Sequence, residues 1–176
     1  MAIHNTSSDA ANTAVRAYLT SLGEKFLGHG FNTGSGKGRE IWEEIKSSFN
    51  QCCAYCNTSE EKLTVEHLIS FNREAGGLHH PGNIVPCCRH CNRRDKIDGK
   101  EVDWETHLLT IAKKKGLTEE EVTDKKNQIL IHIQNYNYPG LEMTLKQKDK
   151  IKSVAEWLYN EVQDAVKRSK DMYLAK

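Results

Sequence analysis

The sequence predicts an α+β fold in which a small, strand-bearing and metal-binding segment is flanked by helices. Apolar residues recur every three or four positions towards both ends of the chain, as they do on the buried face of a helix. Between these parts, the stretch "LTVEHLISF" at 63–71 alternates like a half-buried strand. Two C-x2-C pairs lie on either side of it. With 176 residues, the chain is long enough for one domain with a substantial core.

Two helices are expected in the first fifty residues. The first covers residues 9–27, with Asp9 as the candidate N-cap. The stretch "GHGFNTGSGKGRE" at 28–40 contains five glycines and no apolar periodicity, so we expect a flexible connection there. The second helix follows this connection and carries Ile41 and Ile45 on its apolar face.

Three further helices are expected in the C-terminal part of the chain. The first begins near Trp104 and is stopped by Gly116. The second begins at a capping box formed by Thr118 and Glu121, and "YPG" at 138–140 ends it. The third carries one apolar stripe made by Ile151, Val154, Ala155, Leu158, Val162 and Ala165.

These patterns divide the chain into three predicted regions. Residues 1–50 form an N-terminal helical region with a glycine-rich linker, residues 51–104 the cysteine-bearing core, and residues 105–176 a C-terminal helical region. No apolar run approaches the roughly 20 residues that span a bilayer, so no membrane partner is expected. The start "MAIHNTSSDAANT" lacks the basic and apolar regions of a signal peptide, and we therefore expect a cytoplasmic protein.

The cysteines predict a structural zinc site. Each C-x2-C pair places two sulfurs on one side of a tight turn, and 31 residues separate the pairs, so the two pairs can supply four thiolates to a tetrahedral ion. The alternatives are two disulfides, which a reducing compartment disfavours, or buried free thiols. Cys52 and Cys87, each one residue before a pair, are interpreted as small buried apolar residues. The expected zinc ligands are Cys53, Cys56, Cys88 and Cys91.

Polar residues between and just after the cysteine pairs are brought together when zinc joins the pairs. They are Glu66 and His67 in the strand-like stretch, Asn83 in "GNIVPCC", and Asn92 after the last cysteine. On a strand, His67 shares a face with Val65, whereas Glu66 points to the other face. From Cys53 to about residue 104, this order of motifs resembles the zinc-supported HNH endonucleases of the ββα-metal class.

The resemblance implies a role for each of these polar residues. His67 is the general base that activates water, and Asn83 fixes the geometry of the loop and the base. Glu66, where the family more often has Asp, and Asn92 are the protein ligands of a catalytic divalent ion, Mg²⁺ or Mn²⁺. Read on their own, a histidine that titrates near pH 6.5 and oxygen ligands for a hard cation suit this chemistry. Three other histidines remain alternatives: His79 and His80 as phosphate contacts or ligands, and His90 as a zinc ligand.

Basic residues gather directly after the second cysteine pair. The net charge of the chain is only +1, so a phosphodiester backbone has to be recognised by local clusters. A further lysine cluster at 146–152 opens the last helix, as a solvated face or as a contact for an anionic partner. The expected DNA-binding residues are Arg89, Arg93, Arg94, Lys96 and Lys100.

The function that these observations predict is metal-dependent endonucleolytic cleavage of DNA. The resemblance implies products with 5′-phosphate and 3′-hydroxyl ends, and we expect a role in restriction or anti-phage defence. One alternative makes the chain the nuclease subunit of an assembly with an ATPase, in which the C-terminal helices contact the protein partner. The other is a zinc-knuckle module that binds nucleic acid without cutting it, because Glu66 replaces the more usual Asp.

Overall fold

The computed structural model describes residues 6–59 and 62–174 as a mixed α and β fold, which confirms the predicted class. No helix in these ranges is both long and apolar enough to cross a membrane. The α-helices are α1 (Ser7–Leu27), α2 (Gly36–Ser48), α3 (Trp104–Lys115), α4 (Glu119–Asn135) and α5 (Leu145–Leu174).

Two short antiparallel hairpins provide the β structure. In the first, β1 (Thr64–His67) pairs with β2 (Ile84–Cys87), so that Glu66 lies opposite Val85. In the second, β3 (Lys96–Ile97) pairs with β4 (Lys100–Glu101). Asp98 and Gly99 turn this hairpin with φ values of 51° and 79°, the left-handed conformation that Asp-Gly favours in a two-residue turn. The sequence interpretation missed this hairpin, although its Asp-Gly pair signals one.

The predicted helix ends are largely confirmed. Thr118 and Glu121 form the expected capping box of α4, and Gly116 ends α3 with a φ of 68°. The expected N-cap of α1 is wrong by one turn. Thr6 caps the helix, and Asp9 is the third helical residue, whose carboxylate accepts a hydrogen bond from the Thr6 backbone N–H. Asp9 therefore belongs to a capping box, a pattern that a lone acidic residue does not reveal.

The glycine-rich stretch at 28–40 is less flexible than expected, because α2 already begins at Gly36. Gly38 is buried against the backbone of Asn32, and a Cβ at this position would lie 2.3 Å from the Asn32 carbonyl oxygen. The second half of the stretch is thus packed helix. Glycine serves there for close approach of two backbone segments, and the prediction of a flexible connection is wrong for this half.

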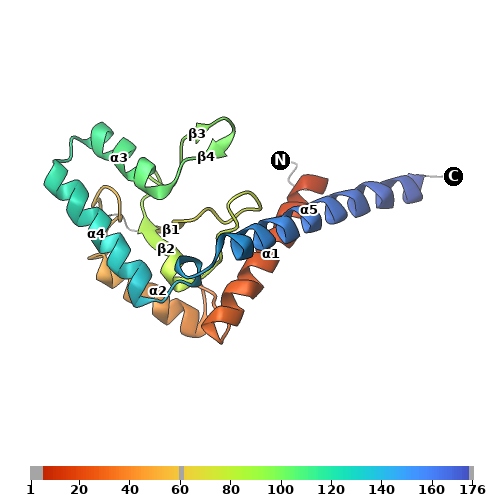
Figure 1. The fold of residues 1–176 in the computed structure, drawn as a ribbon, viewed down its shortest axis with the longest axis horizontal. Coiled ribbons are helices and arrows are strands. Elements are labelled where there is room, and N and C mark those ends of the chain that lie inside the picture. Colours follow the sequence, from red (N-terminus) through yellow and green to blue (C-terminus); the bar gives the residue numbers. More distant parts are fainter. Residues whose placement is uncertain (1–5, 60–61, 175–176) are drawn as a thin grey trace.

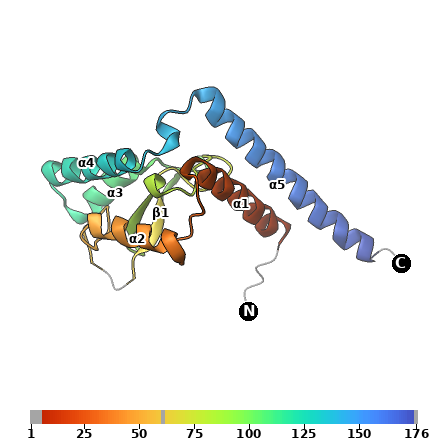
Figure 2. The ribbon, with the colours of Figure 1, turned by 90° about the horizontal axis from the view of Figure 1, so that it is seen from below.

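The long helices α1 and α5 lie side by side, and α2, α3 and α4 surround the β1–β2 hairpin (Figures 1 and 2). The far end of α5 extends beyond the rest of the molecule. One cluster of buried apolar side chains includes Val15 of α1, Ile84 of β2, Ile129 of α4 and Ala155 of α5. A shared core therefore sets the position of the terminal helices relative to the hairpin.

Gly23 brings α1 into direct contact with the loop that follows β1. A Cβ at Gly23 would lie 2.3 Å from the carbonyl oxygen of His79 and 3.0 Å from its carbonyl carbon. These are backbone atoms, which cannot move aside as the end of a side chain can. Nearby, Glu24 accepts a hydrogen bond from the Phe31 backbone N–H at 2.8 Å. The C-terminal part of α1 is therefore positioned by backbone contact with the loop.

We expect Gly23→Ala to lower the melting temperature. In an exposed helix interior, Ala is more favourable than Gly by about 1 kcal/mol, so the same change on a free surface stabilises. Here the added methyl group pushes α1 away from His79. Thermal unfolding followed by circular dichroism measures the effect. The control is Gly30→Ala, where the nearest atom to a built Cβ is 3.7 Å away and little change is expected. A higher melting temperature for Gly23→Ala would contradict the close contact.

Candidate active site

The end of β1 carries two of the predicted catalytic residues on opposite faces of the strand. Glu66 is only 7% exposed, whereas Val65 and His67 are half-buried. The predicted alternation of faces is confirmed. The more buried face is the one that bears the carboxylate, so the structure has to neutralise a charge that it has removed from water.

Arg94 provides that neutralisation. Its Nε donates to Oε1 of Glu66 at 2.7 Å, and its Nη2 lies at the same distance from that oxygen. The guanidinium also donates to the carbonyl oxygens of His67 at 2.6 Å and Val102 at 3.3 Å. Burial raises the pKa of Glu66, and the charge and hydrogen bonds of Arg94 oppose that rise. Arg94 thus ties β1 to the segment after β4.

His67 is held by two aromatic neighbours in the loop after β1. Its Nε2 lies 3.0 Å from Nδ1 of His79, and its ring stacks on Phe71 with centroids 4.7 Å apart and an interplanar angle of 12°. Burial, followed by the neighbouring His79, lowers the pKa of His67 to about 3. The ring is therefore neutral at neutral pH, and one of the two facing nitrogens donates while the other accepts.

Asn83 closes the loop between β1 and β2. Its side chain is buried, and its Oδ1 accepts a hydrogen bond from the backbone N–H of Ile69 at 2.8 Å. Its Nδ2 donates to the carbonyl oxygens of Ile69 at 3.0 Å and Leu78 at 2.8 Å. One amide thus joins the start of the loop, at Ile69, to its end, at Leu78. Ile69 is only two residues beyond His67, so this junction also fixes the end of β1.

Asn92 reaches β1 from the turn made by the second cysteine pair. Its Nδ2 donates to Oγ1 of Thr64 at 2.7 Å and to the carbonyl oxygen of Val65 at 3.1 Å. The orientation of this amide follows from chemistry, because a carbonyl only accepts and the Thr64 hydroxyl already donates to the Cys87 carbonyl at 2.8 Å. The Asn92 amide oxygen remains without a hydrogen-bond partner among the described residues.

One cleft of about 790 Å³ brings many of these side chains together. Of the predicted site residues, Glu66, His67, Asn92, Arg93 and Arg94 line it, while Asn83 is buried behind the loop. Of the other predicted DNA-binding residues, Lys96 and Lys100 lie exposed on the β3–β4 hairpin, and Arg89 lies exposed in the cysteine turn. The remaining lining residues are Asn12, Arg16, Val65, Ser70, Phe71, Asn72 and Glu101.

Sequence interpretation missed two contributions to this cleft. Asn12 and Arg16 reach it from α1, more than forty residues before His67 in the chain, and no local pattern signals their approach. His79 was considered as a phosphate contact or a metal ligand. In the structure it is the hydrogen-bond partner of His67, and a single sequence does not reveal such a pairing across a loop.

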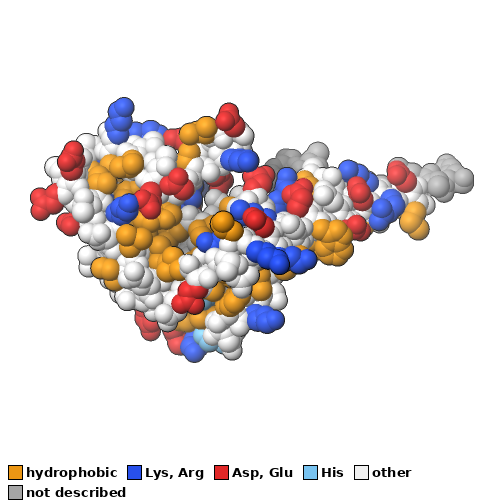
Figure 3. Space-filling view, viewed as in Figure 1, with side chains coloured by type: hydrophobic (Ala, Val, Ile, Leu, Met, Phe, Trp, Pro, Cys, Tyr) orange, Lys and Arg blue, Asp and Glu red, His pale blue; other side chains and the backbone are white. Residues whose placement is uncertain are grey.

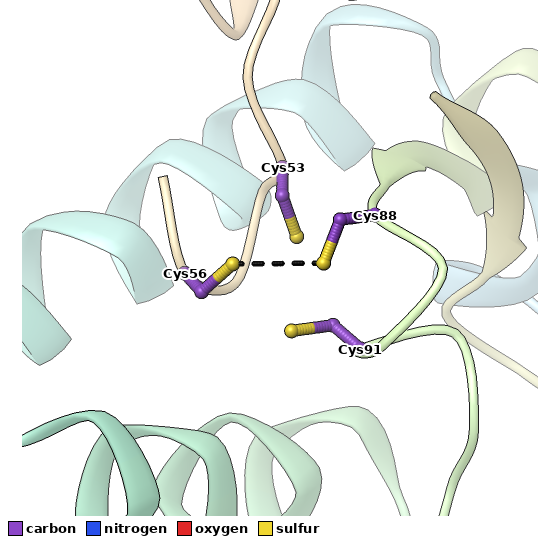
Figure 4. Close-up of side chains that lie close together, drawn as sticks. All are labelled: Cys53, Cys56, Cys88 and Cys91. Atoms are coloured by element: carbon purple, nitrogen blue, oxygen red, sulfur yellow. Dashed lines mark hydrogen bonds between the residues drawn. The ribbon is translucent and has the colours of Figure 1, made fainter. Parts of the chain in front are cut away.

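The four predicted zinc ligands converge on one point (Figure 4). Their sulfur atoms all lie within 4.8 Å of one another, and those of Cys56 and Cys88 are 3.7 Å apart. Zn–S bonds of about 2.3 Å in a tetrahedron place the sulfurs roughly 3.8 Å from each other. Donor set and spacing are therefore compatible with a structural zinc ion.

Neighbouring groups support this cluster. His107 of α3 donates from Nε2 to the Cys91 carbonyl oxygen at 2.7 Å, which joins the second cysteine turn to the helix. The hydrogen bond with Cys53, followed by burial, raises the pKa of the Cys91 thiol. A raised pKa means that the negatively charged thiolate is unfavourable in this position. A bound cation that replaces the thiol protons makes the thiolates favourable again.

The two remaining cysteines differ from each other. Cys87 is fully buried, as expected, and its sulfur lies 3.9 Å from that of Cys53 without belonging to the cluster of four. The interpretation of Cys52 as a buried residue is wrong. It is half-buried, and its thiol donates to the Asn50 carbonyl at 3.3 Å, because the sharp turn at residues 50 and 51 directs it away from the core.

Comparison with protein families identifies the segment that carries this site. Residues 53–96 match the HNH endonuclease family, so the cysteine cluster and the β1–β2 hairpin form an HNH domain. The match covers a quarter of the chain, and the helices on either side lie outside it. Comparisons of the chain with curated proteins and with solved structures gave no match.

We expect Cys88→Ser to reduce bound zinc and to destabilise the fold, because three thiolates and a hydroxyl form a weaker tetrahedral site. Cys87→Ser is the matched control, since it makes the same atomic change next to the cluster and should retain zinc with a small loss of stability. Elemental analysis of protein purified without added zinc, together with thermal unfolding, tests both variants. Equal zinc content in Cys88→Ser and the wild type would exclude Cys88 as a ligand.

Proposed function

We propose that the protein is a metal-dependent endonuclease that hydrolyses DNA phosphodiester bonds to 5′-phosphate and 3′-hydroxyl ends. The observation that carries this proposal is the position of Glu66, His67 and Asn92 in one cleft of an HNH domain. A carboxylate and an amide oxygen that can hold a divalent ion, with a histidine base beside them, have the chemistry that phosphodiester hydrolysis requires.

Glu66 and Asn92 are the proposed ligands of the catalytic ion. The hydrogen bond from Nε of Arg94 and its ion-pair contact from Nη2 both go to Oε1 of Glu66, so Oε2 has no hydrogen-bond partner among residues 6–59 and 62–174. The Asn92 amide oxygen is equally free within those ranges. These two oxygens suit a hard cation. The chemistry that Mg²⁺ or Mn²⁺ supplies when bound there is stabilisation of negative charge on the phosphoryl and leaving oxygens.

His67 is the proposed general base. If its Nε2 donates to Nδ1 of His79, Nδ1 of His67 carries a free lone pair and can accept a proton. As the water oxygen bonds to phosphorus, its proton passes to Nδ1, and the bond from phosphorus to the 3′ oxygen breaks. That oxygen is then protonated from solvent. His79 stabilises the resulting imidazolium because it accepts a charge-assisted hydrogen bond.

Arg94 has a different proposed role from the one expected from sequence. Its side chain is 4% exposed, and its donors are directed to Glu66 and two backbone carbonyls. We therefore assign Arg94 to positioning Glu66 and β1. Direct phosphate contact is assigned to Arg93, which is exposed in the cleft, and to Arg89, Lys96 and Lys100 around it.

The first test is incubation of supercoiled plasmid with purified protein and Mg²⁺, Mn²⁺ or EDTA. Cleavage that requires the divalent ion supports the proposal. If the wild type binds DNA but cuts it with neither ion, the proposal fails and the zinc-knuckle binding module becomes the better account.

The biological setting is a separate proposal. We propose restriction or anti-phage defence, with the chain acting alone or as the nuclease subunit beside an ATPase. The observation that favours a protein partner is the exposed apolar surface of α5, where Trp157 is 61% and Met172 is 79% exposed. Co-purification with an ATPase from the native host, lost on Trp157→Ser, tests the subunit alternative.

We expect His67→Ala to lower the cleavage rate by about 10²- to 10⁴-fold, the usual contribution of a general base. Zinc content and DNA affinity should stay as in the wild type, because His67 is neither an expected zinc ligand nor an assigned phosphate contact. Single-turnover cleavage at saturating protein measures the rate. His90→Ala, which removes an exposed histidine outside the cleft, is the control. Near wild-type cleavage by His67→Ala would show that another group is the base, and His79 would be tested next.

Asn92→Ala is expected to weaken the dependence of cleavage on the divalent ion. Water can replace the lost amide oxygen, so activity should recover partly at high Mg²⁺ or Mn²⁺. Rates measured against metal concentration test this, with Asn127→Ala on the exposed surface of α4 as the control. A variant that loses activity equally at all metal concentrations would not be a ligand variant.

A further inference from the structure

The helix α1 supplies one wall of the cleft from outside the HNH domain. Asn12 and Arg16 line the cleft together with Glu66 and His67. They are four residues apart on α1, so their side chains are neighbours on one helix face. Gly23 follows Arg16 by seven residues, about two turns, and therefore lies close to the same face. The helix face that contacts the loop at His79 thus also faces the site.

Arg16 is held in place by its helix and is free at its charged end. The contact of Gly23 with His79 and the packing of α1 against α5 fix the helix backbone. The Arg16 side chain itself is exposed, and its guanidinium forms no hydrogen bond or ion pair with any residue that the structure describes. A fixed backbone with a free guanidinium is the arrangement of a residue that binds an external anion.

The charge balance of the cleft makes this guanidinium important. Of the three arginines in the lining, Arg94 is already paired with Glu66, and only Arg16 and Arg93 are without such a pair in the described chain. Glu66 and Glu101 add negative charge to the same cleft. Elsewhere on the face in Figure 3, Lys and Arg side chains are interspersed with Asp and Glu. A phosphate backbone that enters the cleft therefore depends on these two arginines.

We propose that Arg16, with Asn12 beside it, binds a DNA phosphate next to the one that is cut, so that the substrate lies between α1 and the HNH domain. This inference rests on the proposed function and adds a substrate-binding residue from a separate helix. Arg93 contacts the backbone from the HNH side, and Arg16 does so from α1. A guanidinium can form two parallel hydrogen bonds with one phosphate, and the Asn12 amide can add a third.

The test is DNA binding without cleavage. Affinity of a labelled duplex is measured by fluorescence anisotropy without added Mg²⁺ or Mn²⁺, over a series of salt concentrations, for the wild type, Arg16→Ala, Arg16→Lys and Arg39→Ala. Arg39 is an exposed arginine of α2 that does not line the cleft, so its variant removes the same charge elsewhere. Zinc content and melting temperature of every variant are measured in parallel, and Asn12→Ala serves as a second variant of the same wall.

We expect Arg16→Ala to weaken binding about tenfold, the usual loss for a hydrogen bond to a charged group. The slope of log affinity against log salt should fall by about 0.9, the value for one phosphate contact. Arg16→Lys should restore the slope and only part of the affinity, because it keeps the charge without the planar fork. Arg39→Ala should match the wild type.

Two outcomes overturn the inference: equal affinity and slope for Arg16→Ala and Arg39→Ala, or no DNA binding by the wild type. The proposed function is judged separately by cleavage. A wild type that cuts plasmid, with an Arg16→Ala variant that binds and cuts equally well, refutes the role of Arg16 and leaves the nuclease proposal intact. A wild type that binds without cutting, with weakened binding in Arg16→Ala, refutes the nuclease proposal and supports the role of Arg16.

Discussion

The site depends on the cluster of four sulfur atoms that joins residues 53–56 to residues 88–91. The strands between these two turns have four residues each, and a hairpin of that size has little stability in water on its own. A bound ion that holds the two turns together lowers the entropic cost of ordering the segment between them. It also brings Asn92 close to β1. An ion held by all four cysteines would have no open coordination position, so the role that its ligands favour is to arrange the polar residues of the cleft.

The second constraint is the buried carboxylate of Glu66. An unpaired charge in this position would cost several kcal/mol. Arg94 offsets part of that cost by pairing with one oxygen of the carboxylate, while the other has no partner among the described residues. The same guanidinium binds the backbone of His67 and of Val102. The ion pair therefore orders the strand end and the segment after the β3–β4 hairpin at once. It also explains why the basic cluster in the sequence overestimates the number of positive charges that remain available to an external anion, because Arg94 is already paired with Glu66.

Local features of the structure were predictable, and features that depend on distant contacts were not. The ends of α3 and α4 follow from Gly116, Thr118 and Glu121, because capping chemistry acts within one turn. The convergence of the cysteines follows from their spacing. In contrast, the sequence predicted Arg94 to be an exposed DNA-binding residue, because a sequence does not show that Arg94 pairs with the carboxylate of Glu66. Arg16 gives no signal at all, since its position depends on the packing of α1 against α5 and on the contact between Gly23 and His79.

Asn83 has a consequence for how the loop after β1 can change. The backbone N–H of Leu68 donates to the Asn83 carbonyl, and one residue further the Asn83 side chain takes the place of the next strand residue by pairing with both polar groups of Ile69. The ladder thus continues through an amide, because the backbone turns away in the 3-10 turn Pro81–Asn83 and the Gly82 N–H donates to Nδ1 of His80 instead. Only a side chain with one acceptor and one donor at this reach can do so, and neither Asp nor Leu qualifies. Because both loop ends are fixed at this point, residues inserted at the exposed Glu74 add little to the entropic cost of closing the loop. The strand end with Glu66 and His67 keeps its position as long as Phe71 and His79 stay in contact with His67.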